Sequence, residues 1–327
     1  MIGITGPLSS ELVFLEAPIL QRTRIYHRGD TILRDAITME NTVDLDKYNA
    51  EVYLRFNTDL DSTTETASAS VPTFYTDQNG FSIEKRVKVA SIGLEGNYYP
   101  VNTMAFIQDP AQRRRFSVLT DHSHGFSSFE TGRLEALIER RTPHDDSRGM
   151  QEGVTDNRPT TSNYILLLES VNVTTRTEDY RNMLPTLKSY RLSQQLNYPP
   201  QLFIFPQENL RRRSFPPLRL LSQPFPSDSN LLNLRTISGN AENGTELPSK
   251  RALMVLQKLA FNFASPNKDS LGAFFVKNGT HFSNLQLNEI QGVELTGSPS
   301  SQNETYGKLS EIPAEPFDLT SVIIAFK

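Results

Sequence analysis

The sequence predicts an all-β protein in which a large β-sandwich is followed by a smaller one. The main observation is a hydrophobic periodicity of two, the spacing that places alternate side chains on opposite faces of a strand. Turn-forming residues separate these segments, with 17 Gly and 20 Pro in 327 residues. Helical segments do not alternate with the strands, so antiparallel sandwiches are favoured over a parallel α/β sheet.

Four segments of the first domain carry the strand signal. In residues 51–56, apolar and polar side chains alternate, which is typical of a strand buried on one face. Residues 115–120 show a weaker alternation of the same kind. The segments 164–168 and 202–205 are apolar on both faces, which predicts strands at the centre of a sandwich.

Two further segments of this domain are less regular. Residues 133–141 fit either a strand or a helix, because Leu134 and Leu137 also match helical spacing. One short helix is expected, with Pro185 in its first turn, since proline is well suited to the first helical position. Its place in a chain of strands predicts a connector rather than a structural layer.

The domain boundary is predicted at the densest cluster of turn-forming residues, 214–229. The large sandwich is therefore assigned to residues 1–215 and the smaller one to residues 216–327. In the second domain, residues 319–326 are predicted to form a buried closing strand. Two polar stretches are expected to be long loops, 238–250 and 297–307.

Composition excludes several functional classes. The 33 Lys and Arg residues balance 37 Asp and Glu residues, which favours neither nucleic acid nor a membrane surface as partner. No apolar run reaches the roughly 18–20 residues that span a bilayer, so no membrane segment is expected in this chain. Without cysteine, the chain has no disulfides, thiolate metal sites or cysteine nucleophiles.

Two histidine-containing pairs have a spacing that could hold a metal, but neither is assigned as a metal site. His144 and Asp146 would share one face of a strand, yet the acidic residues followed by Ser147, Arg148 and Gly149 favour a turn. His122 and His124 have the same spacing in a loop rich in Ser and Gly, where a solvated loop is favoured. We therefore expect no metal ligand from either pair.

A hairpin is predicted at residues 74–80, because Asn79-Gly80 is a strong tight-turn signal after an apolar stretch. Tyr75 and Asp77 in this hairpin would give sugar recognition its usual parts, an apolar ring face and fixed hydrogen-bonding groups. The basic run 113–115 is predicted to be a solvated strand edge that discourages edge-to-edge pairing.

Several motifs follow one another along the chain: Phe74-Tyr75-Thr76-Asp77-Gln78-Asn79-Gly80-Phe81, Asn97-Tyr98-Tyr99-Pro100, Ile107-Gln108-Asp109, Gly125-Phe126-Ser127-Ser128, Glu139-Arg140-Arg141, Asp145-Asp146-Ser147-Arg148-Gly149 and Leu166-Leu167-Leu168-Glu169. In this order and near this spacing they resemble the C-terminal region of class II α-mannosidases, glycoside hydrolase family 38. The similarity is strong from about residue 50 to residue 169.

The resemblance implies a galactose-mutarotase-like super-sandwich followed by a smaller sandwich, taken from a retaining, zinc-dependent enzyme that removes mannose from N-glycans. In that family the zinc ligands, the nucleophile and the acid lie upstream of the matched region. The chain is thus expected to hold no cofactor itself and to partner an N-terminal α-mannosidase barrel domain, in the same or a separate chain, and a mannose-containing glycan.

Three residues are the candidates for substrate binding by this resemblance. Tyr75 is expected to line the mannose pocket, Asp77 to belong to the hairpin that carries it, and Ser227 to lie in a loop that approaches the pocket. The resemblance also implies a Golgi lumenal location, with the lysosome or the cell exterior as alternatives. A competing reading is a stand-alone carbohydrate-binding or structural β-sandwich, since fold does not fix function.

Overall fold

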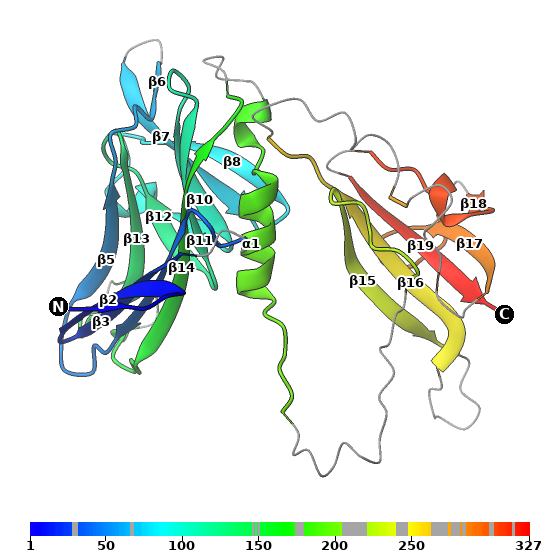
Figure 1. Ribbon diagram of the computed structural model, residues 1–327, viewed down its shortest axis with the longest axis horizontal. Helices are drawn as coiled ribbons and strands as arrows, with labels where there is room; N and C mark the ends of the chain where they lie inside the picture. The colour runs from blue at the N-terminus through cyan, green and yellow to red at the C-terminus, as the bar shows by residue number, and fades with distance from the viewer. Residues whose placement is uncertain are drawn as a thin grey trace. The chain divides into compact units, whose positions relative to one another are not determined.

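The protein divides into two compact units (Figure 1). One unit comprises Met1–Gln201 with Asn262–Ser265, and the other comprises Leu202–Phe261 with Pro266–Lys327. The structure, a computed structural model, describes residues 1–27, 32–65, 69–145, 147, 149, 151–173, 180–204, 221–239, 248–262, 274–275, 282, 286–300, 304–315 and 318–327. The boundary predicted at residue 215 lies outside the described residues.

The first unit is built on a ten-stranded antiparallel sheet with the order β1-β2-β3-β4-β14-β11-β10-β7-β6, in which β8 also pairs with β7. Its strands are β1 (Ile2–Thr5), β2 (Ser9–Glu16), β3 (Ile19–Tyr26), β4 (Ala36–Val43), β6 (Thr63–Glu65), β7 (Ser70–Gln78), β8 (Ser82–Val87), β10 (Met104–Asp109), β11 (Arg114–Thr120) and β14 (Thr160–Ser170). The strands predicted at 115–120 and 164–168 are confirmed, and both lie in the interior of the sheet.

A four-stranded sheet covers one face of the large sheet, so this unit is a sandwich. Its order is β5-β13-β12-β9, from β5 (Glu51–Asn57), β13 (Arg133–Arg140), β12 (His124–Ser127) and β9 (Tyr99–Val101). The segment 133–141, whose pattern fitted either a strand or a helix, forms strand β13. Phe56, Phe126 and Leu134 of this sheet pack against Phe74 and Val118 of the large sheet. The core between the sheets explains the alternation seen at 51–56.

A helix covers the opposite face of the large sheet (Figure 1). Helix α1 (Leu187–Asn197) buries Leu192 against Phe106, Leu119 and Leu167. Strand β14 therefore contacts the helix with Leu167 and the small sheet with Leu166, which is why this strand is apolar on both faces. The helix is a layer of the fold, so its prediction as a mere connector was wrong.

The start of the helix also differs from the prediction. Thr186 caps it, with its hydroxyl accepting from the backbone N–H of Ser189 at 3.0 Å while the Ser189 side chain accepts from the Thr186 N–H. Pro185 therefore precedes the cap and is not in the first turn. The threonine hydroxyl accepts a hydrogen bond from a backbone N–H of the first turn, whereas proline has no side-chain acceptor. The helix therefore begins after Thr186.

The second unit contains a five-stranded antiparallel sheet with the order β15-β16-β19-β17-β18. Its strands are β15 (Ser229–Ser238), β16 (Pro248–Lys258), β17 (Leu287–Val293), β18 (Thr305–Tyr306) and β19 (Leu319–Phe326). The closing strand at 319–326 is confirmed as the central strand β19. The loop expected at 297–307 contains the short strand β18. Phe274, Phe275 and Phe282 cover one face of this sheet.

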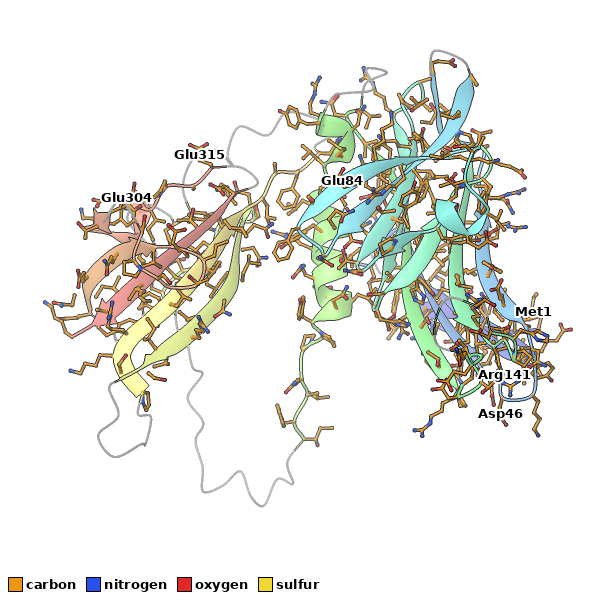
Figure 2. All side chains as sticks on the ribbon, turned by 180° about the vertical axis from the view of Figure 1, so that it is seen from behind. Met1, Asp46, Glu84, Arg141, Glu304 and Glu315 are labelled. Carbon is orange, nitrogen blue, oxygen red and sulfur yellow. The ribbon has the colours of Figure 1, made fainter. Side chains whose placement is uncertain are left out.

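One predicted strand is absent. Leu202, Phe203 and Ile204 form no strand and are 84%, 71% and 85% exposed, while Phe205 lies outside the described residues. Short 3-10 helices complete the secondary structure: η1 (Glu95–Asn97), η2 (Tyr180–Met183) and η3 (Leu309–Glu311). Within the described part of the chain, no helix is long and apolar enough to cross a bilayer. Charged side chains such as Glu84 and Glu304 project from the surface (Figure 2).

Candidate functional site

Asp77 organises the predicted hairpin, which strands β7 and β8 form. The turn residues Asn79 and Gly80 have φ angles of 52° and 76°, as a type I′ turn requires. Asp77 is 3% exposed, and its Oδ2 accepts from the Gly80 N–H at 2.7 Å. Its Oδ1 accepts from three consecutive backbone N–H groups at 2.8, 3.0 and 3.3 Å, those of Asn102, Thr103 and Met104. Asp77 therefore joins the hairpin to the start of β10.

Tyr75 lies on the face of the large sheet that α1 covers. It is 5% exposed, and its ring stacks on that of Phe106, with centroids 4.8 Å apart and planes 13° apart. The guanidinium of Arg115 lies 3.9 Å from the centroid of the same Phe106 ring. Burial raises the pKa of the Tyr75 hydroxyl, so it stays protonated at neutral pH.

Arg115 is a fully buried cation, so its prediction as part of a solvated edge was wrong. It is 1% exposed on an interior strand. Its Nε and Nη2 donate to Gln108 Oε1 at 3.0 and 2.7 Å, and its Nη1 donates to the Leu184 carbonyl at 2.6 Å. Burial lowers the pKa of Arg115 to about 10, with the Glu169 carboxylate opposing the shift. The side chain is still charged at neutral pH, which makes its hydrogen bonds strong.

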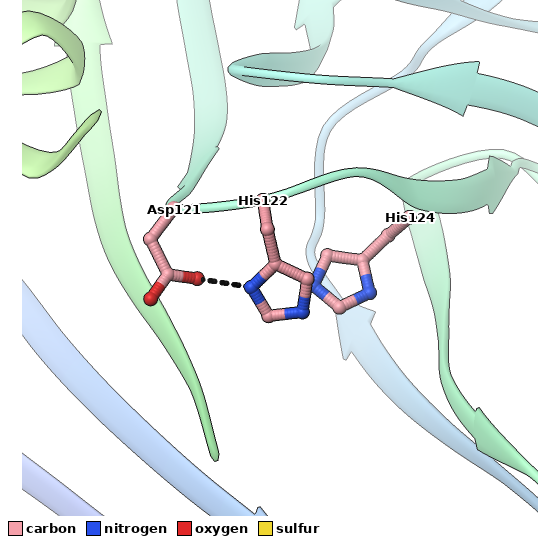
Figure 3. Close-up of side chains that lie close together, drawn as sticks. All are labelled: Asp121, His122 and His124. Carbon is pink, nitrogen blue, oxygen red and sulfur yellow. Dashed lines mark hydrogen bonds and ion pairs between the residues drawn. The ribbon is translucent and has the colours of Figure 1, made fainter. Parts of the chain in front are cut away.

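A polar cluster that the sequence analysis did not assign lies at the end of β11, where the chain passes to the small sheet (Figure 3). Asp121 Oδ1 lies 2.7 Å from His122 Nδ1, and the two imidazole centroids of His122 and His124 are 4.3 Å apart. The Asp121 carboxylate also accepts from Asn163 Nδ2 at 2.7 Å. His124 is 7% exposed and begins strand β12, so the expectation of a solvated loop was wrong there.

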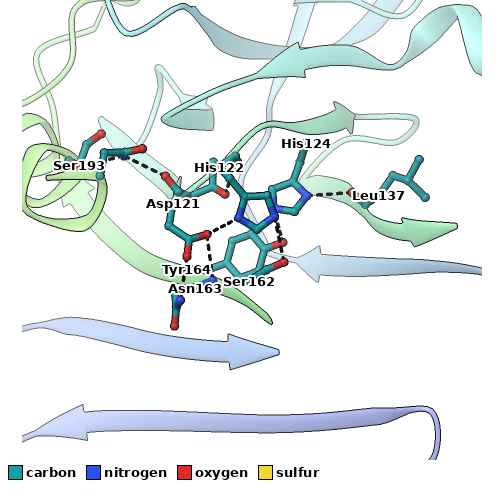
Figure 4. A network of polar contacts seen from close by, with 10 residues as sticks. Asp121, His122, His124, Leu137, Ser162, Asn163, Tyr164 and Ser193 are labelled. Carbon is teal, nitrogen blue, oxygen red and sulfur yellow. Dashed lines mark hydrogen bonds and ion pairs between the residues drawn. The ribbon is translucent and has the colours of Figure 1, made fainter. Parts of the chain in front are cut away.

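The other ends of both imidazoles meet side chains of β14 (Figure 4). His124 Nε2 lies 3.0 Å from the Tyr164 hydroxyl, and His122 Nε2 lies 3.4 Å from Ser162 Oγ. His124 Nδ1 lies 3.2 Å from the Leu137 carbonyl of β13. The cluster thus connects both sheets of the sandwich. The sequence feature that could have indicated this cluster is Asp121, a third potential metal ligand directly before His122.

Asp121, His122 and Ser162 have the connectivity of a catalytic triad, in which a carboxylate orients a histidine that activates a serine. Ser162, however, is 0% exposed within the large sheet. A nucleophile has to reach the substrate carbonyl, so burial excludes this serine from acyl transfer.

The two histidines have pKa values shifted in opposite directions. The hydrogen bond with Asp121 raises the pKa of His122. Burial, reinforced by the neighbouring His122, lowers the pKa of His124 to about 4. Between pH 6.5 and 4 the unfolded chain therefore binds more protons at His124 than the folded chain, so stability falls as the pH falls through this window. His122 acts in the opposite sense, because its stabilisation is complete below its unfolded pKa and is lost as the pH rises through its folded pKa.

We expect replacement of His124 with glutamine to reduce the acid sensitivity of the fold. The loss of unfolding free energy between pH 6.5 and pH 4 should be smaller in the variant by about 2–3 kcal/mol, since one pKa unit corresponds to about 1.4 kcal/mol. Urea denaturation at a series of pH values measures this slope. The exposed His144→Gln is the matched control and should keep the slope of the parent. An unchanged slope in His124→Gln would contradict the assignment.

The remaining candidate residues lie outside the Asp77 hairpin and the histidine cluster. Ser227 is an exposed turn residue of the second unit, and the turn is closed by the Ser229 N–H donating to the Pro226 carbonyl at 2.9 Å. Next to it, Asp228 forms a buried ion pair with Lys258 at 2.9 Å. His144 is exposed, and Asp146 lies outside the described residues.

Among the concavities formed by the described residues, two lie on the first unit. One of about 330 Å³ is lined by residues of β2, β3, β4 and α1, including Glu11 and Glu40. The other, of about 480 Å³, is lined by residues of β9, β12 and β13, including His124 and Glu139. Neither concavity is lined by any of the three candidate substrate-binding residues.

Comparison with known proteins assigns a family to part of the first unit. The model of the glycosyl hydrolases family 38 C-terminal domain matches residues 3–148. These residues form a family 38 C-terminal domain. The match begins in β1 and runs past β13, so it includes the hairpin of Tyr75 and both histidines of the cluster.

Sequence similarity to individual proteins extends over the whole chain. Alpha-mannosidase 2 of Spodoptera frugiperda is 33% identical over 353 residues, covering 100% of this chain and 30% of the relative. Alpha-mannosidase 2 of Homo sapiens is 29% identical, covering 98% of this chain and 27% of the relative. A lysosomal alpha-mannosidase of Dictyostelium discoideum is 31% identical over 45% of this chain. The chain therefore spans less than a third of the length of the first two relatives.

A solved structure supports the fold. An alpha-mannosidase from Enterococcus faecalis V583 superposes with a TM-score of 0.53 at 11% identity, covering 93% of this chain and 28% of the other. At this identity the comparison bears on the fold alone, and it agrees with the all-β prediction.

The catalytic zinc implied by the family does not fit the residues described here. Among them, the group of side chains that could hold a metal is Asp121, His122 and His124. A zinc glycosidase also needs a nucleophilic carboxylate free to attack the sugar. The carboxylate of this cluster is held by His122 and Asn163. No catalytic step is therefore assigned to a metal in this chain.

Proposed function

We propose that this chain is the C-terminal part of an α-mannosidase that trims mannose from N-glycans. It contributes the scaffold and one wall of the mannose pocket, while an N-terminal barrel domain supplies the zinc, the nucleophile and the acid. The observation that carries the proposal is the family 38 domain at residues 3–148, combined with similarity to alpha-mannosidase 2 across the chain. The same similarity supports a Golgi lumenal location, with the lysosome or the cell exterior as alternatives.

The charged groups of the first concavity agree with a chain that is inactive alone. Glycoside hydrolysis needs one carboxyl group that can donate a proton and a second that is free to attack or to activate water. Glu11 and Glu40 both line the 330 Å³ concavity. Each is paired with an arginine, Glu11 with Arg24 at 2.5 Å and Glu40 with Arg22 at 3.2 Å. Each carboxylate is held by its arginine and is therefore not free to attack the sugar or to activate water.

Tyr75 is proposed as the residue that contacts the sugar, and Asp77 as a positioning residue. A tyrosine supplies both an apolar ring face and a hydroxyl, which suits a sugar. Both oxygens of Asp77 are occupied by backbone N–H groups, so its role in the pocket is to hold the hairpin that carries Tyr75. Ser227, on an exposed turn of the second unit, is proposed as a further substrate-binding residue.

We expect the isolated chain to show no hydrolysis of p-nitrophenyl α-mannoside, with or without added Zn²⁺. The measurement is release of p-nitrophenol by the purified chain, with a full-length α-mannosidase as the positive control. Turnover that persists through repurification and metal exchange would overturn the proposal. Calorimetric binding of mannose to the isolated chain, lost in Tyr75→Ala, would instead favour a stand-alone carbohydrate-binding module.

A further inference from the structure

The two imidazoles of the polar cluster are oriented in the same way. His122 Nδ1 lies 2.7 Å from Asp121 Oδ1, and His124 Nδ1 lies 3.2 Å from the Leu137 carbonyl. A carboxylate and a carbonyl can only accept, so each Nδ1 is the protonated nitrogen of a neutral ring. Each Nε2 then carries the lone pair. Acceptors on the far ring nitrogen are what fix the tautomer of histidines that bind metals.

Both Nε2 atoms are directed at the same short stretch of β14. His122 Nε2 lies 3.4 Å from Ser162 Oγ, and His124 Nε2 lies 3.0 Å from the Tyr164 hydroxyl. Ser162 and Tyr164 stand two apart on one strand, so they share one face of the sheet. The two rings lie beside one another in Figure 3, with centroids 4.3 Å apart. The two lone pairs therefore converge on one region.

We propose that His122 and His124 bind a divalent transition-metal ion through their Nε2 atoms. Imidazole nitrogen is a ligand that suits Zn²⁺, Cu²⁺ and Ni²⁺, whereas Mg²⁺ and Ca²⁺ prefer oxygen. One potential ligand atom from each of Asp121, His122 and His124, a ring nitrogen or a carboxylate oxygen, lies within 4.8 Å of the other two. In this arrangement Asp121 orients His122, water completes the coordination, and the hydroxyl groups of β14 turn to face that water.

The cluster is accessible to an ion. The His122 side chain is 41% exposed, and His124 lines the concavity of about 480 Å³. Binding would join the loop after β11 to β12 of the small sheet. The adjacent helix is linked to the same loop, because Asn197 Nδ2 donates to the Thr120 carbonyl at 3.1 Å. In this proposal the bound ion has a structural role.

Isothermal titration of the full chain with ZnCl₂ tests this inference. We expect one equivalent of Zn²⁺ to bind and EDTA to reverse the binding. His122→Ala removes one of the two ligands at an exposed position, so binding should be lost. Asp121→Asn should weaken it by about 10–100-fold, the usual effect of removing the group that orients a ligating histidine. His144→Ala is the matched control for an exposed histidine next to acidic residues, and it should bind as the parent does.

A second readout keeps the test decisive if a variant loses structure. On titration with Zn²⁺, the ¹⁵N resonances of Nε2 in both His122 and His124 should shift in the parent chain, with smaller changes at Nδ1. Circular dichroism without metal checks that each variant is folded. Absence of binding by the parent, binding that persists in folded His122→Ala, or loss of binding in His144→Ala would each overturn the proposal. None of these outcomes depends on mannosidase activity, so they leave the proposed function unaffected.

Discussion

Replacement of Arg115 with methionine is expected to lower the free energy of unfolding by about 3–5 kcal/mol, because several buried acceptors lose their donor at a cost of about 1–3 kcal/mol each. The guanidinium donates to Gln108 Oε1 and to the Leu184 carbonyl, and the Arg115 side chain is buried. Methionine fills much of the volume but supplies no donor, so these buried acceptors lose the partners that offset their desolvation. Urea denaturation followed by circular dichroism measures the change.

The neighbouring Arg114 provides the matched control. It begins the same strand but faces solvent, and its Nη1 donates to Ser170 Oγ at 3.0 Å. Arg114→Met should change stability by less than about 0.5 kcal/mol, as exposed substitutions usually do. Equal losses in the two variants would show that the buried network of Arg115 has no special role in stability. Arg115→Lys should recover only part of the loss, because lysine lacks the planar fork that serves several acceptors at once.

These two arginines show what the sequence could predict about the fold. The alternation in residues 115–120 identified β11, and the same alternation implies that adjacent side chains face opposite sides. Whether Arg115 faces water or a core depends on the strand's neighbours, β10 and β14, and on η2 and the helix cap that follow 60–70 residues later. Local pattern carries no information on such partners, so a run of three arginines suggested an exposed edge.

The same limit explains the other errors. Residues 202–204 have the composition of a core strand, but no described strand pairs with them and they are exposed. Conversely, residues 319–326 were correctly predicted to be buried, because β16 and β17 pair with both edges of β19. His122 and His124 were assigned to a solvated loop because Tyr164 and Leu137, which contact His124, are distant in sequence. The hairpin of Asp77 was predicted because its turn signal is local.

Replacement of Asp77 with alanine is expected to destabilise the first unit by about 2–4 kcal/mol. Its two oxygens accept from four backbone N–H groups, of which one belongs to the type I′ turn and three to the segment that leads into β10. A hydrogen bond to a charged group contributes about 1.5–3 kcal/mol, and buried donors left without a partner add to the cost. The contributions of bonds that share one carboxylate do not add in full, so the expected total is smaller than their sum. Hydrogen exchange at the amides of Gly80 and residues 102–104 should accelerate more than exchange elsewhere in the unit.

The isosteric Asp77→Asn separates charge from shape. Its amide NH₂ faces backbone donors in place of one oxygen, so we expect a smaller loss, about 1–3 kcal/mol, with exchange accelerated on one side of the hairpin only. Asp46→Asn, at an exposed position of the same unit, should leave both stability and exchange unchanged. If Asp77→Ala accelerated exchange uniformly, the carboxylate would not be what holds the hairpin. The position of Tyr75 would then have to depend on its stacking against Phe106 alone, and the assignment of Asp77 as the residue that positions it would fail.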